Sequence, residues 1–140
     1  MIPRPVLFTL GVDDLTRETA FWHEVFGWVP SPRSQGDLVV YDFDGYALAL
    51  HPRESLADDA GLEPQGTGFS GITLSINVPS EKEVEKRLLL AVHYGARLVR
   101  RAQKTSRGGF NGYFTTPSGH LFEVAFNPYW KLDADGRLTP

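Results

Sequence analysis

The chain contains one sequence pattern twice. Residues 8–13, Phe-Thr-Leu-Gly-Val-Asp, open a segment near the start, and residues 72–77, Ile-Thr-Leu-Ser-Ile-Asn, open a similar segment after the midpoint. The offset between the copies is 64 residues, as from Thr9 to Thr73. Each copy continues through an amphipathic helix and closes with a strand after a turn glycine. We expect two such units to pair around a shared cleft, with the function located between the repeats.

The first repeat, residues 5–51, begins with a strand and a helix. Alternating side chains over residues 6–12 predict a strand whose two faces differ, one of them facing the core. Asp13 and Asp14 supply an N-cap and negative charge for a helix over residues 15–26. Gly27 supplies the left-handed residue that ends such a helix.

The rest of the first repeat is predicted to be strands. Pro30 and Pro32 interrupt the segment after the helix, so we expect only a loose, edge-like strand there. Residues 38–43 and 46–51 flank Asp44-Gly45, a dipeptide that permits the positive φ of a tight turn, and they predict a β-hairpin.

The linker and the second repeat complete the chain. Residues 52–70 are rich in Pro, Gly, Asp and Glu and form the linker, with a short helical turn near residues 54–59. The second repeat covers residues 71–127, and Ser80 with Glu83 forms a capping box for a helix to about Tyr94. We expect three further strands and a loop over residues 103–109, with a tail at 128–140; the strands cover residues 96–101, 110–115 and 120–126.

Composition narrows the class of protein. The 140 residues form one domain's worth of chain, and 41% hydrophobic and 12% aromatic residues suffice for a packed core. A net charge of −3 argues against a nucleic-acid partner, and no apolar run reaches membrane-spanning length. The absence of cysteine excludes disulfides, thiolate metal sites and cysteine nucleophiles. We expect a cytoplasmic protein, because the first residues carry no signal-peptide pattern.

Two segments resemble the vicinal oxygen chelate superfamily, which includes glyoxalase I, extradiol dioxygenases and bleomycin-resistance proteins. One is Leu-Gly-Val-Asp-Asp-Leu at 10–15 with the aromatic residues after it, and the more specific one is Tyr-Phe-Thr-Thr-Pro-Ser-Gly-His-Leu-Phe-Glu-Val at 113–124. The tail at 127–130, Asn-Pro-Tyr-Trp, is similar to that of bacterial glyoxalase-like members. The resemblance implies a single α+β domain of two βαβββ repeats, forming a curved mixed sheet around a central cleft, and a homodimer.

The resemblance also identifies the positions where a metal would bind. Catalytic members hold a divalent ion with up to four strand positions, which here are Leu7, Ala49, Gly71 and Glu123. Three of these residues have no donor in their side chain, and one carboxylate is too few for a catalytic divalent ion. We therefore expect no metal and no other cofactor.

Glu123 and His51 are the candidate catalytic residues. In residues 121–126, Glu123 alternates onto the face opposite Phe122 and Val124, so it should line the cleft. There it could act as a general base or bind a ligand, or it could be a former metal ligand now paired with a neighbour. His51 could form an acid–base pair with Glu123, the two could be ligands of a weak metal site, or His51 could be a solvated residue at the end of a strand.

The predicted ligand pocket combines hydroxyl, small and apolar side chains. Such a lining suits a mainly apolar ligand with a few polar groups, although the same residues are also ordinary in strands. A glycine-bearing loop could close over the ligand as a lid through its two cations, or it could be a plain connection. The pocket residues are Leu7, Thr9, Ala49, Gly71, Thr73, Ser75, Leu121 and Glu123, and the lid residues are Lys104, Arg107, Gly108 and Gly109.

Two hypotheses for function arise from these observations. The first is metal-independent binding of a small organic molecule in the cleft between the repeats, similar to the antibiotic-sequestering branch of the superfamily. The alternative is a glyoxalase-like lyase or isomerase in which Glu123, with or without His51, transfers a proton. The lack of the metal-binding residues favours the first hypothesis.

Overall fold

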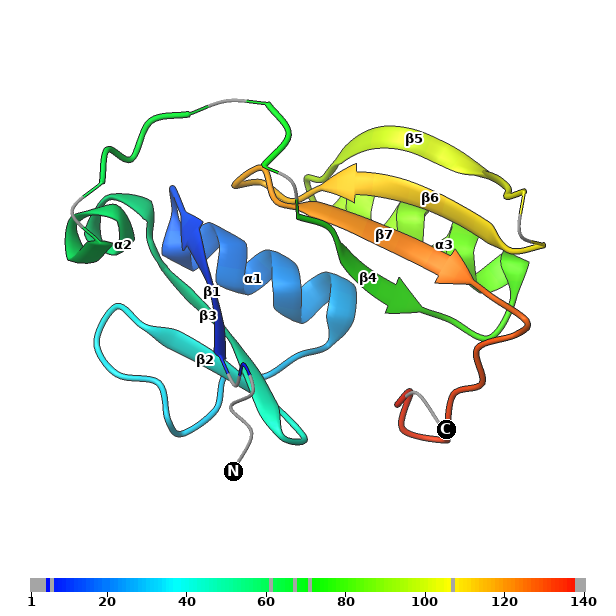
Figure 1. The fold of residues 1–140 in the computed structure, drawn as a ribbon, viewed down its shortest axis with the longest axis horizontal. Helices are drawn as coiled ribbons and strands as arrows, with labels where there is room; N and C mark the ends of the chain where they lie inside the picture. Colours follow the sequence, from blue (N-terminus) through cyan, green and yellow to red (C-terminus); the bar gives the residue numbers. More distant parts are fainter. Residues whose placement is uncertain are drawn as a thin grey trace. The chain divides into compact units, whose positions relative to one another are not determined.

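The computed structural model describes residues 5, 7–60, 62–66, 68–70, 72–106 and 108–137. The chain forms two compact units, Met1–Gly68 and Phe69–Pro140 (Figure 1). The division falls at the end of the linker, so each unit contains one of the two repeats.

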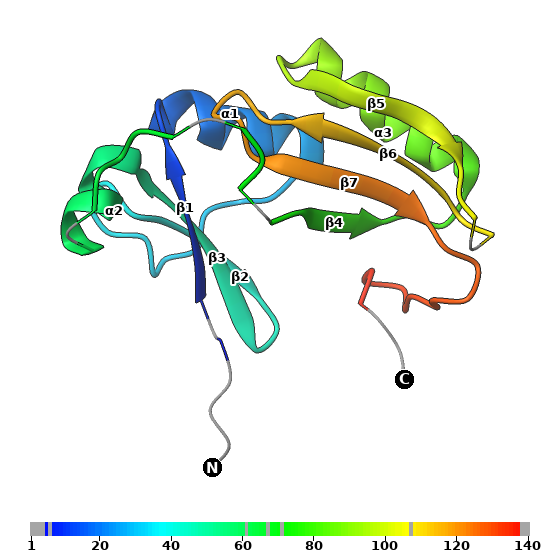
Figure 2. The same cartoon turned by 45° about the horizontal axis from the view of Figure 1, so that its top comes forward.

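The first unit contains a three-stranded sheet and two helices. The strand order is β1-β3-β2, with β1 parallel to β3 and β2 antiparallel to it (Figure 2). The turn between β2 and β3 is the predicted Asp44-Gly45, and Gly45 has a φ of 86°. The elements are β1 (Leu7–Val12), α1 (Leu15–Phe26), β2 (Val39–Phe43), β3 (Tyr46–Pro52) and α2 (Arg53–Ala60).

Both ends of α1 are where the sequence predicts them. The side chain of Asp14 accepts a hydrogen bond from the backbone N–H of Arg17, which satisfies one of the free donors of the first turn. Gly27 has a φ of 73° and donates its N–H to the carbonyl of His23. The buried side of the helix includes Trp22, which has no exposed surface.

The strand predicted after Pro30 does not form in the described residues. The segment has only an isolated bridge between Gln35 and Leu38. Ser31 donates its N–H to the carbonyl of Val40 over 2.6 Å, so the segment still runs beside β2. The prolines on either side of Ser31 have no N–H, and a regular ladder cannot continue without these donors.

The second unit contains the complete βαβββ repeat. Its sheet has the order β4-β7-β6-β5, with β4 parallel to β7 and the other pairs antiparallel. Helix α3 contacts β5, β6 and β7 from one face of this sheet (Figure 1). The elements are β4 (Leu74–Asn77), α3 (Glu81–His93), β5 (Arg97–Lys104), β6 (Phe110–Thr115) and β7 (Leu121–Phe126).

Small and aromatic residues of β6 and β7 form the core beneath α3. Phe114 and Phe122 are fully buried and stack with their ring centroids 5.6 Å apart. Gly112 lets the helix approach the sheet, because a Cβ there would lie 2.5 Å from Cδ1 of Leu88. The alternate residues of β6 and β7 therefore face away from α3.

The two repeats share their topology, since the first strand of each lies parallel to the last. Their offset in the structure is 66 residues at the helix N-caps, Asp14 and Ser80. Strand pairing agrees with this value when the turn glycines Gly45 and Gly119 are aligned, because Ala49 then corresponds to Glu123, and their partners are Thr9 and Ser75. This differs by two residues from the sequence offset and leaves each side chain on the same face.

The predicted α+β class is confirmed, and the described strands, predicted as one curved mixed sheet, form two sheets of three and four strands. The four-stranded sheet differs in detail from the prediction, because β5 continues to Lys104 instead of ending at Arg101. Within the described residues, no helix is long and apolar enough to cross a membrane.

Candidate functional site

Glu123 lies in the middle of β7, on the face of the sheet opposite α3. Its neighbours Phe122 and Val124 are fully buried, whereas Glu123 is partly exposed. The alternation of the strand thus separates the carboxylate from the apolar core. The sequence prediction that Glu123 faces away from these large side chains agrees with this geometry.

Three side chains from two neighbouring strands donate hydrogen bonds to Glu123. The hydroxyl of Ser75 on β4 donates to Oε1 over 2.6 Å. On β6, Asn111 donates from Nδ2 to Oε2 over 2.6 Å, and the hydroxyl of Tyr113 donates to the same oxygen over 3.3 Å. The carboxylate is therefore held in place from both sides of its own strand.

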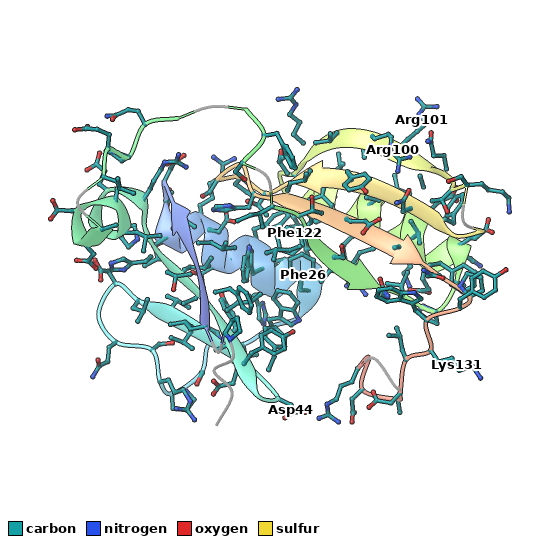
Figure 3. All side chains as sticks on the ribbon, in the orientation of Figure 1. Phe26, Asp44, Arg100, Arg101, Phe122 and Lys131 are labelled. Atoms are coloured by element: carbon teal, nitrogen blue, oxygen red, sulfur yellow. The ribbon has the colours of Figure 1, made fainter. Side chains whose placement is uncertain are left out.

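Arg100 on the edge strand β5 extends this network. Its Nη2 donates to Oδ1 of Asn111, and its Nη1 donates to the backbone carbonyl of Arg101 over 3.1 Å. The guanidinium carbon lies 5.1 Å from the centroid of the Tyr113 ring, which is the geometry of a cation–π contact. Figure 3 labels Arg100 and Arg101 beside β5.

Register places four of these residues in one line across the sheet. Ser75 lies opposite Glu123, Glu123 lies opposite Tyr113, and Tyr113 lies opposite Arg100. Asn111 is two residues before Tyr113 on the same face. We call this set the polar row: Ser75, Arg100, Asn111, Tyr113 and Glu123.

The charge of Glu123 affects Tyr113. Burial, and then the negative charge and hydrogen bond of Glu123, raise the pKa of Tyr113 above its usual value, and Arg100 opposes this shift. The phenol is therefore neutral at physiological pH and acts as a hydrogen-bond donor. The polar row thus presents one carboxylate, one cation and three neutral polar groups.

The predicted pocket residues are divided between the two units. In the second unit, Ser75 bonds to Glu123, Leu121 shares the face of Glu123, and Thr73 is exposed before β4 begins. Gly71 lies outside the described residues.

In the first unit, Leu7 is 48% exposed and Thr9 pairs with Ala49, which has no exposed surface. These three residues lie in β1 and β3, apart in the chain from the polar row. Their assignment to a ligand pocket stays a prediction.

Sequence reasoning missed Arg100, Asn111 and Tyr113. The sequence could have indicated Asn111 and Tyr113, because polar and apolar residues alternate over residues 110–115. The polar ones lie on the same face of the sheet as Glu123, which pairs with Tyr113. Arg100 could not be found in this way. The pairing of β5 with β6 shifts register on both sides of Arg100, so simple alternation along β5 does not hold.

His51 is located at the end of β3 in the first unit. Its Nδ1 lies 3.2 Å from the backbone oxygen of Asp37 and 3.5 Å from the carboxylate of the same residue. A backbone oxygen can only accept, so the hydrogen bond requires a proton on Nδ1. The side chain is 15% exposed, and these contacts connect the end of β3 to Asp37, which precedes β2. The pair of His51 with Glu123 stays a prediction.

The predicted lid corresponds to the β5–β6 turn. Lys104 belongs to β5 and forms an exposed ion pair with Glu81 at 3.0 Å. The backbone N–H and C=O groups of Thr105 both form hydrogen bonds within the turn, and its hydroxyl accepts from the N–H of Gly109 over 2.9 Å. Gly108 has a φ of 83°, which suits glycine. Arg107 lies outside the described residues, so lid closure stays a prediction.

The donor set does not fit the divalent ion that catalytic members of the superfamily hold. In the part of the chain that the structure describes, no three His, Asp or Glu side chains are grouped as metal ligands. The side chains of Leu7 and Ala49 carry no donor atoms. Both oxygens of Glu123 already accept hydrogen bonds from protein groups. The carboxylate is thus engaged with the protein itself rather than arranged as one member of a ligand set.

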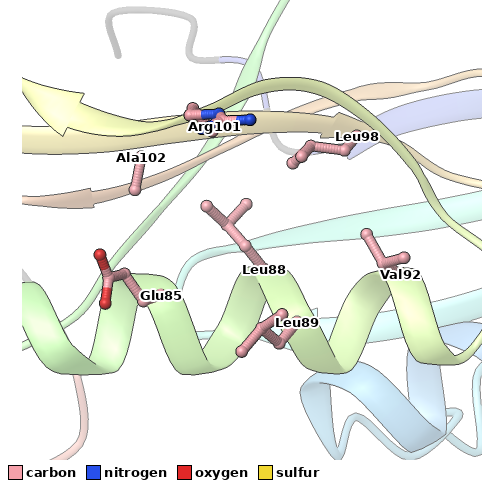
Figure 4. Close-up of a pocket in the computed structure, with 7 residues that line it drawn as sticks. All are labelled: Glu85, Leu88, Leu89, Val92, Leu98, Arg101 and Ala102. Carbon is pink, nitrogen blue, oxygen red and sulfur yellow. The ribbon is translucent and has the colours of Figure 1, made fainter.

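A separate groove lies on the other side of the same sheet, between α3 and β5 (Figure 4). It has a volume of about 430 Å³, and aliphatic side chains form most of its surface. Leu89 is 74% exposed there, and the charged residues Glu85 and Arg101 flank the groove. No catalytic pairing is present in this lining, so the polar row is the better candidate site.

Comparison with known proteins identifies the family. The model of the glyoxalase-like domain matches residues 7–125 of the chain. The chain belongs to the glyoxalase-like family. This confirms the resemblance to the vicinal oxygen chelate superfamily inferred from the sequence.

Solved structures of glyoxalase-like proteins agree with this assignment. A glyoxalase-related enzyme from Fulvimarina pelagi is 33% identical, with a TM-score of 0.86 and 99% of each chain covered. No curated protein matches the chain.

More distant glyoxalase-like structures share the fold. A glyoxalase/bleomycin resistance protein/dioxygenase family enzyme from Burkholderia phytofirmans PsJN is 17% identical, with a TM-score of 0.76 over 86% of this chain and 95% of the other. A lactoylglutathione lyase from Agrobacterium tumefaciens is 20% identical, with a TM-score of 0.67 over 93% and 98% of the two chains.

Proposed function

We propose that this glyoxalase-like protein binds a small organic molecule at the polar row, without a resident metal. The observation that carries the proposal is the carboxylate of Glu123, which polar side chains of β4 and β6 surround on one face of a sheet. Polar groups that lose water need partners, and these hydrogen bonds hold the carboxylate in a fixed position on the sheet. Here every hydrogen-bond partner of Glu123 is neutral and at least partly exposed, which leaves the row accessible to a ligand.

The surroundings of the row favour a ligand with both apolar and polar parts. Leu121 and Ala125 lie on either side of Glu123 on the same face, and both are partly exposed. Ligand sites in proteins commonly combine apolar lining with a few polar groups that orient the ligand. The form of binding that we propose is sequestration of an organic compound, as the sequence resemblance to the antibiotic-sequestering branch of the superfamily implies.

Glu123→Gln tests the proposal. The substitution removes the charge and replaces one acceptor oxygen by an amide NH2 group. This new donor would face the donor of either Ser75 or Asn111, so one hydrogen bond is lost. Binding of small organic molecules, measured by nuclear magnetic resonance against the wild-type protein, should weaken at least about tenfold. Glu85→Gln is the matched control, because Glu85 flanks the groove on the α3 side of the sheet. Equal binding by both variants and the wild type would contradict the proposal.

Proton transfer by Glu123 is the second candidate function. It is favoured by the contact of Glu123 with the neutral phenol of Tyr113, since a carboxylate and a phenol are a base and an acid within hydrogen-bonding distance. The related protein from Fulvimarina pelagi is also named a glyoxalase-related enzyme. In this case a product should be detectable by mass spectrometry, and Glu123→Gln should abolish turnover. Sequestration instead predicts protection of cells from the ligand without a new product.

The homodimer and the cytoplasmic location stay predictions from the sequence. Exposed apolar side chains occur on α3 and β5, among them Leu89, Leu98 and Val99. Light scattering after size-exclusion chromatography measures the mass of the particle in solution. A mass near twice the 15.6 kDa of the chain would support the dimer.

A further inference from the structure

We propose that Arg100 makes the polar row selective for an organic acid, whose carboxylate binds the guanidinium while a hydroxyl group of the same molecule binds Glu123. This inference rests on the proposed function and adds the chemical class of the ligand. Three observations on Arg100 support it: its position in the polar row, its hydrogen bonds, and the lack of a carboxylate within ion-pair distance in the described chain.

Arg100 retains donors that the protein does not use. A guanidinium has five N–H groups. Within the described residues, the side chain donates to the amide oxygen of Asn111 and to the backbone carbonyl of Arg101, and it also interacts with the hydroxyl of Tyr113. None of these partners is charged, and no carboxylate of the described chain lies within ion-pair distance of Arg100. A partly buried cation without a counter-ion is an attractive site for an anion.

Asn111 keeps the cation and the carboxylate apart. Its oxygen faces Arg100 and its nitrogen faces Glu123, and these two partners fix the orientation of the amide, because a reversed amide would place donor against donor at Arg100. The ring of Tyr113 packs against the guanidinium. Arg100 and Glu123 are therefore both held in place and do not neutralise each other directly.

The spacing of the strands sets the length of the ligand. Glu123 is on β7 and Arg100 is on β5, with β6 between them. Neighbouring strands lie about 4.8 Å apart, so the two backbones are separated by roughly 10 Å. Because both side chains lean toward Asn111 and Tyr113, the two polar ends of the ligand should be separated by a short chain of several carbon atoms. An arginine fork binds a carboxylate through two parallel hydrogen bonds, which a neutral amide cannot match.

A series of ω-hydroxy acids tests the inference. The probes are 4-hydroxybutanoate, 6-hydroxyhexanoate and 8-hydroxyoctanoate, each compared with its neutral amide, and the readouts are the dissociation constant and the shift of the Arg100 side-chain N–H signal. We expect the best acid to bind about tenfold more tightly than its amide, since its hydrogen bonds to Arg100 are charge-assisted. Equal affinity of acid and amide would overturn the inference.

Three variants identify the residue responsible. Arg100→Gln should remove the preference for the acid over the amide, and Arg100→Lys should retain a preference but weaken the binding of the acid, because lysine lacks the planar fork. Arg101→Gln is the matched control, since it makes the same change of charge at the neighbouring residue, whose side chain borders the α3 groove. Loss of the preference in Arg101→Gln to the same degree would also overturn the inference.

Different experimental results would overturn this inference and the proposed function. If the acids and amides bind equally and both lose affinity in Glu123→Gln, only the role of Arg100 is wrong. If no probe of the series shifts any signal of the polar row, the selectivity for hydroxy acids is wrong. If a broader screen of small organic molecules also gives no shifts there, the proposed binding site itself is wrong.

Discussion

Asn111 donates a hydrogen bond from Nδ2 to Oε2 of Glu123 over 2.6 Å, although the two residues are not opposite each other in the sheet. Asn111 pairs with Ala125, and Glu123 pairs with Tyr113. The contact is therefore diagonal, as long side chains on one face of an antiparallel pair permit. Through its oxygen the same amide also holds Arg100, so it joins the anion and the cation of the polar row.

Replacing Asn111 should destabilise the second unit by a modest amount. Asn111→Ala removes the hydrogen bonds to both Glu123 and Arg100, and because all three side chains are partly exposed we expect a loss of about 1–2 kcal/mol in the free energy of unfolding. Asn77→Ala on β4 serves as control, with an expected change within about 0.5 kcal/mol. Urea denaturation measures both. Equal losses would show that the amide contacts contribute nothing.

The alkaline titration of Tyr113 should reveal its contact with Glu123. Burial and the charge of Glu123 raise the pKa of Tyr113, whereas Arg100 lowers it. Glu123→Gln should therefore shift the titration to lower pH, and Arg100→Gln should shift it to higher pH. Carbon nuclear magnetic resonance of labelled tyrosine measures each value. A shift in the same direction in both variants would contradict the arrangement.

The same pKa shift makes stability depend on alkaline pH. The unfolded chain loses the phenolic proton near pH 10, before the folded protein does. The contribution of Tyr113 to stability is thus fully present below about pH 10 and decreases as the pH rises toward the folded pKa. Tyr113→Phe should show a smaller decrease over this range than the wild type. Unfolding curves at several alkaline pH values test this, and parallel curves for the two proteins would count against it.

Tyr41 in the first unit should gain stability when its hydroxyl is removed. The side chain is 1% exposed, and its hydroxyl makes no hydrogen bond of standard geometry among the described residues, although the nearby Thr19 side chain lowers its pKa. Since a buried hydroxyl without a well-formed hydrogen bond costs free energy, Tyr41→Phe should increase the free energy of unfolding by about 1 kcal/mol. Tyr46→Phe is the control, because Tyr46 is 44% exposed. A loss of stability in Tyr41→Phe would show that the contact with Thr19 outweighs the cost of burying the hydroxyl.

Gly112 should not tolerate a side chain. A Cβ at this position would lie 2.5 Å from Leu88 and 3.0 Å from the backbone nitrogen of Ala102. Gly112→Ala should therefore force α3 or β5 to move and cost about 1–3 kcal/mol. Gly66→Ala meets only the end of the Arg53 side chain at 3.9 Å and should be nearly neutral. Thermal unfolding compares the two variants, and a neutral Gly112→Ala would mean that α3 can move away easily.

Much of the fold could be predicted because its signals are local. The cap at Asp14, the stop at Gly27 and the turn at Gly45 each depend on a few adjacent residues, and all three are where the sequence predicts them. The position of Glu123 on its strand follows from alternation alone. The prediction of a strand after Pro30 is wrong. The second repeat has a strand at the corresponding place, but here the two prolines lack the N–H donors that a strand needs.

The candidate site could be predicted only in part. The alternation of each strand predicts that Ser75 and Glu123 both face the cleft, and the structure joins them by a hydrogen bond. The contribution of Arg100 depends on irregular pairing between β5 and β6, which leaves no periodic signal in the sequence.

Chemical-shift mapping of the nitrogen-15-labelled protein with a set of small organic molecules tests the central claim most directly. The second unit offers two surfaces on opposite sides of one sheet, the polar row and the groove of α3 and β5. We predict that the shifts gather at Ser75, Asn111 and Tyr113 and vanish in Glu123→Gln. Shifts confined to the groove around Leu89 and Leu98, or shifts at the polar row that survive Glu123→Gln, would contradict the account.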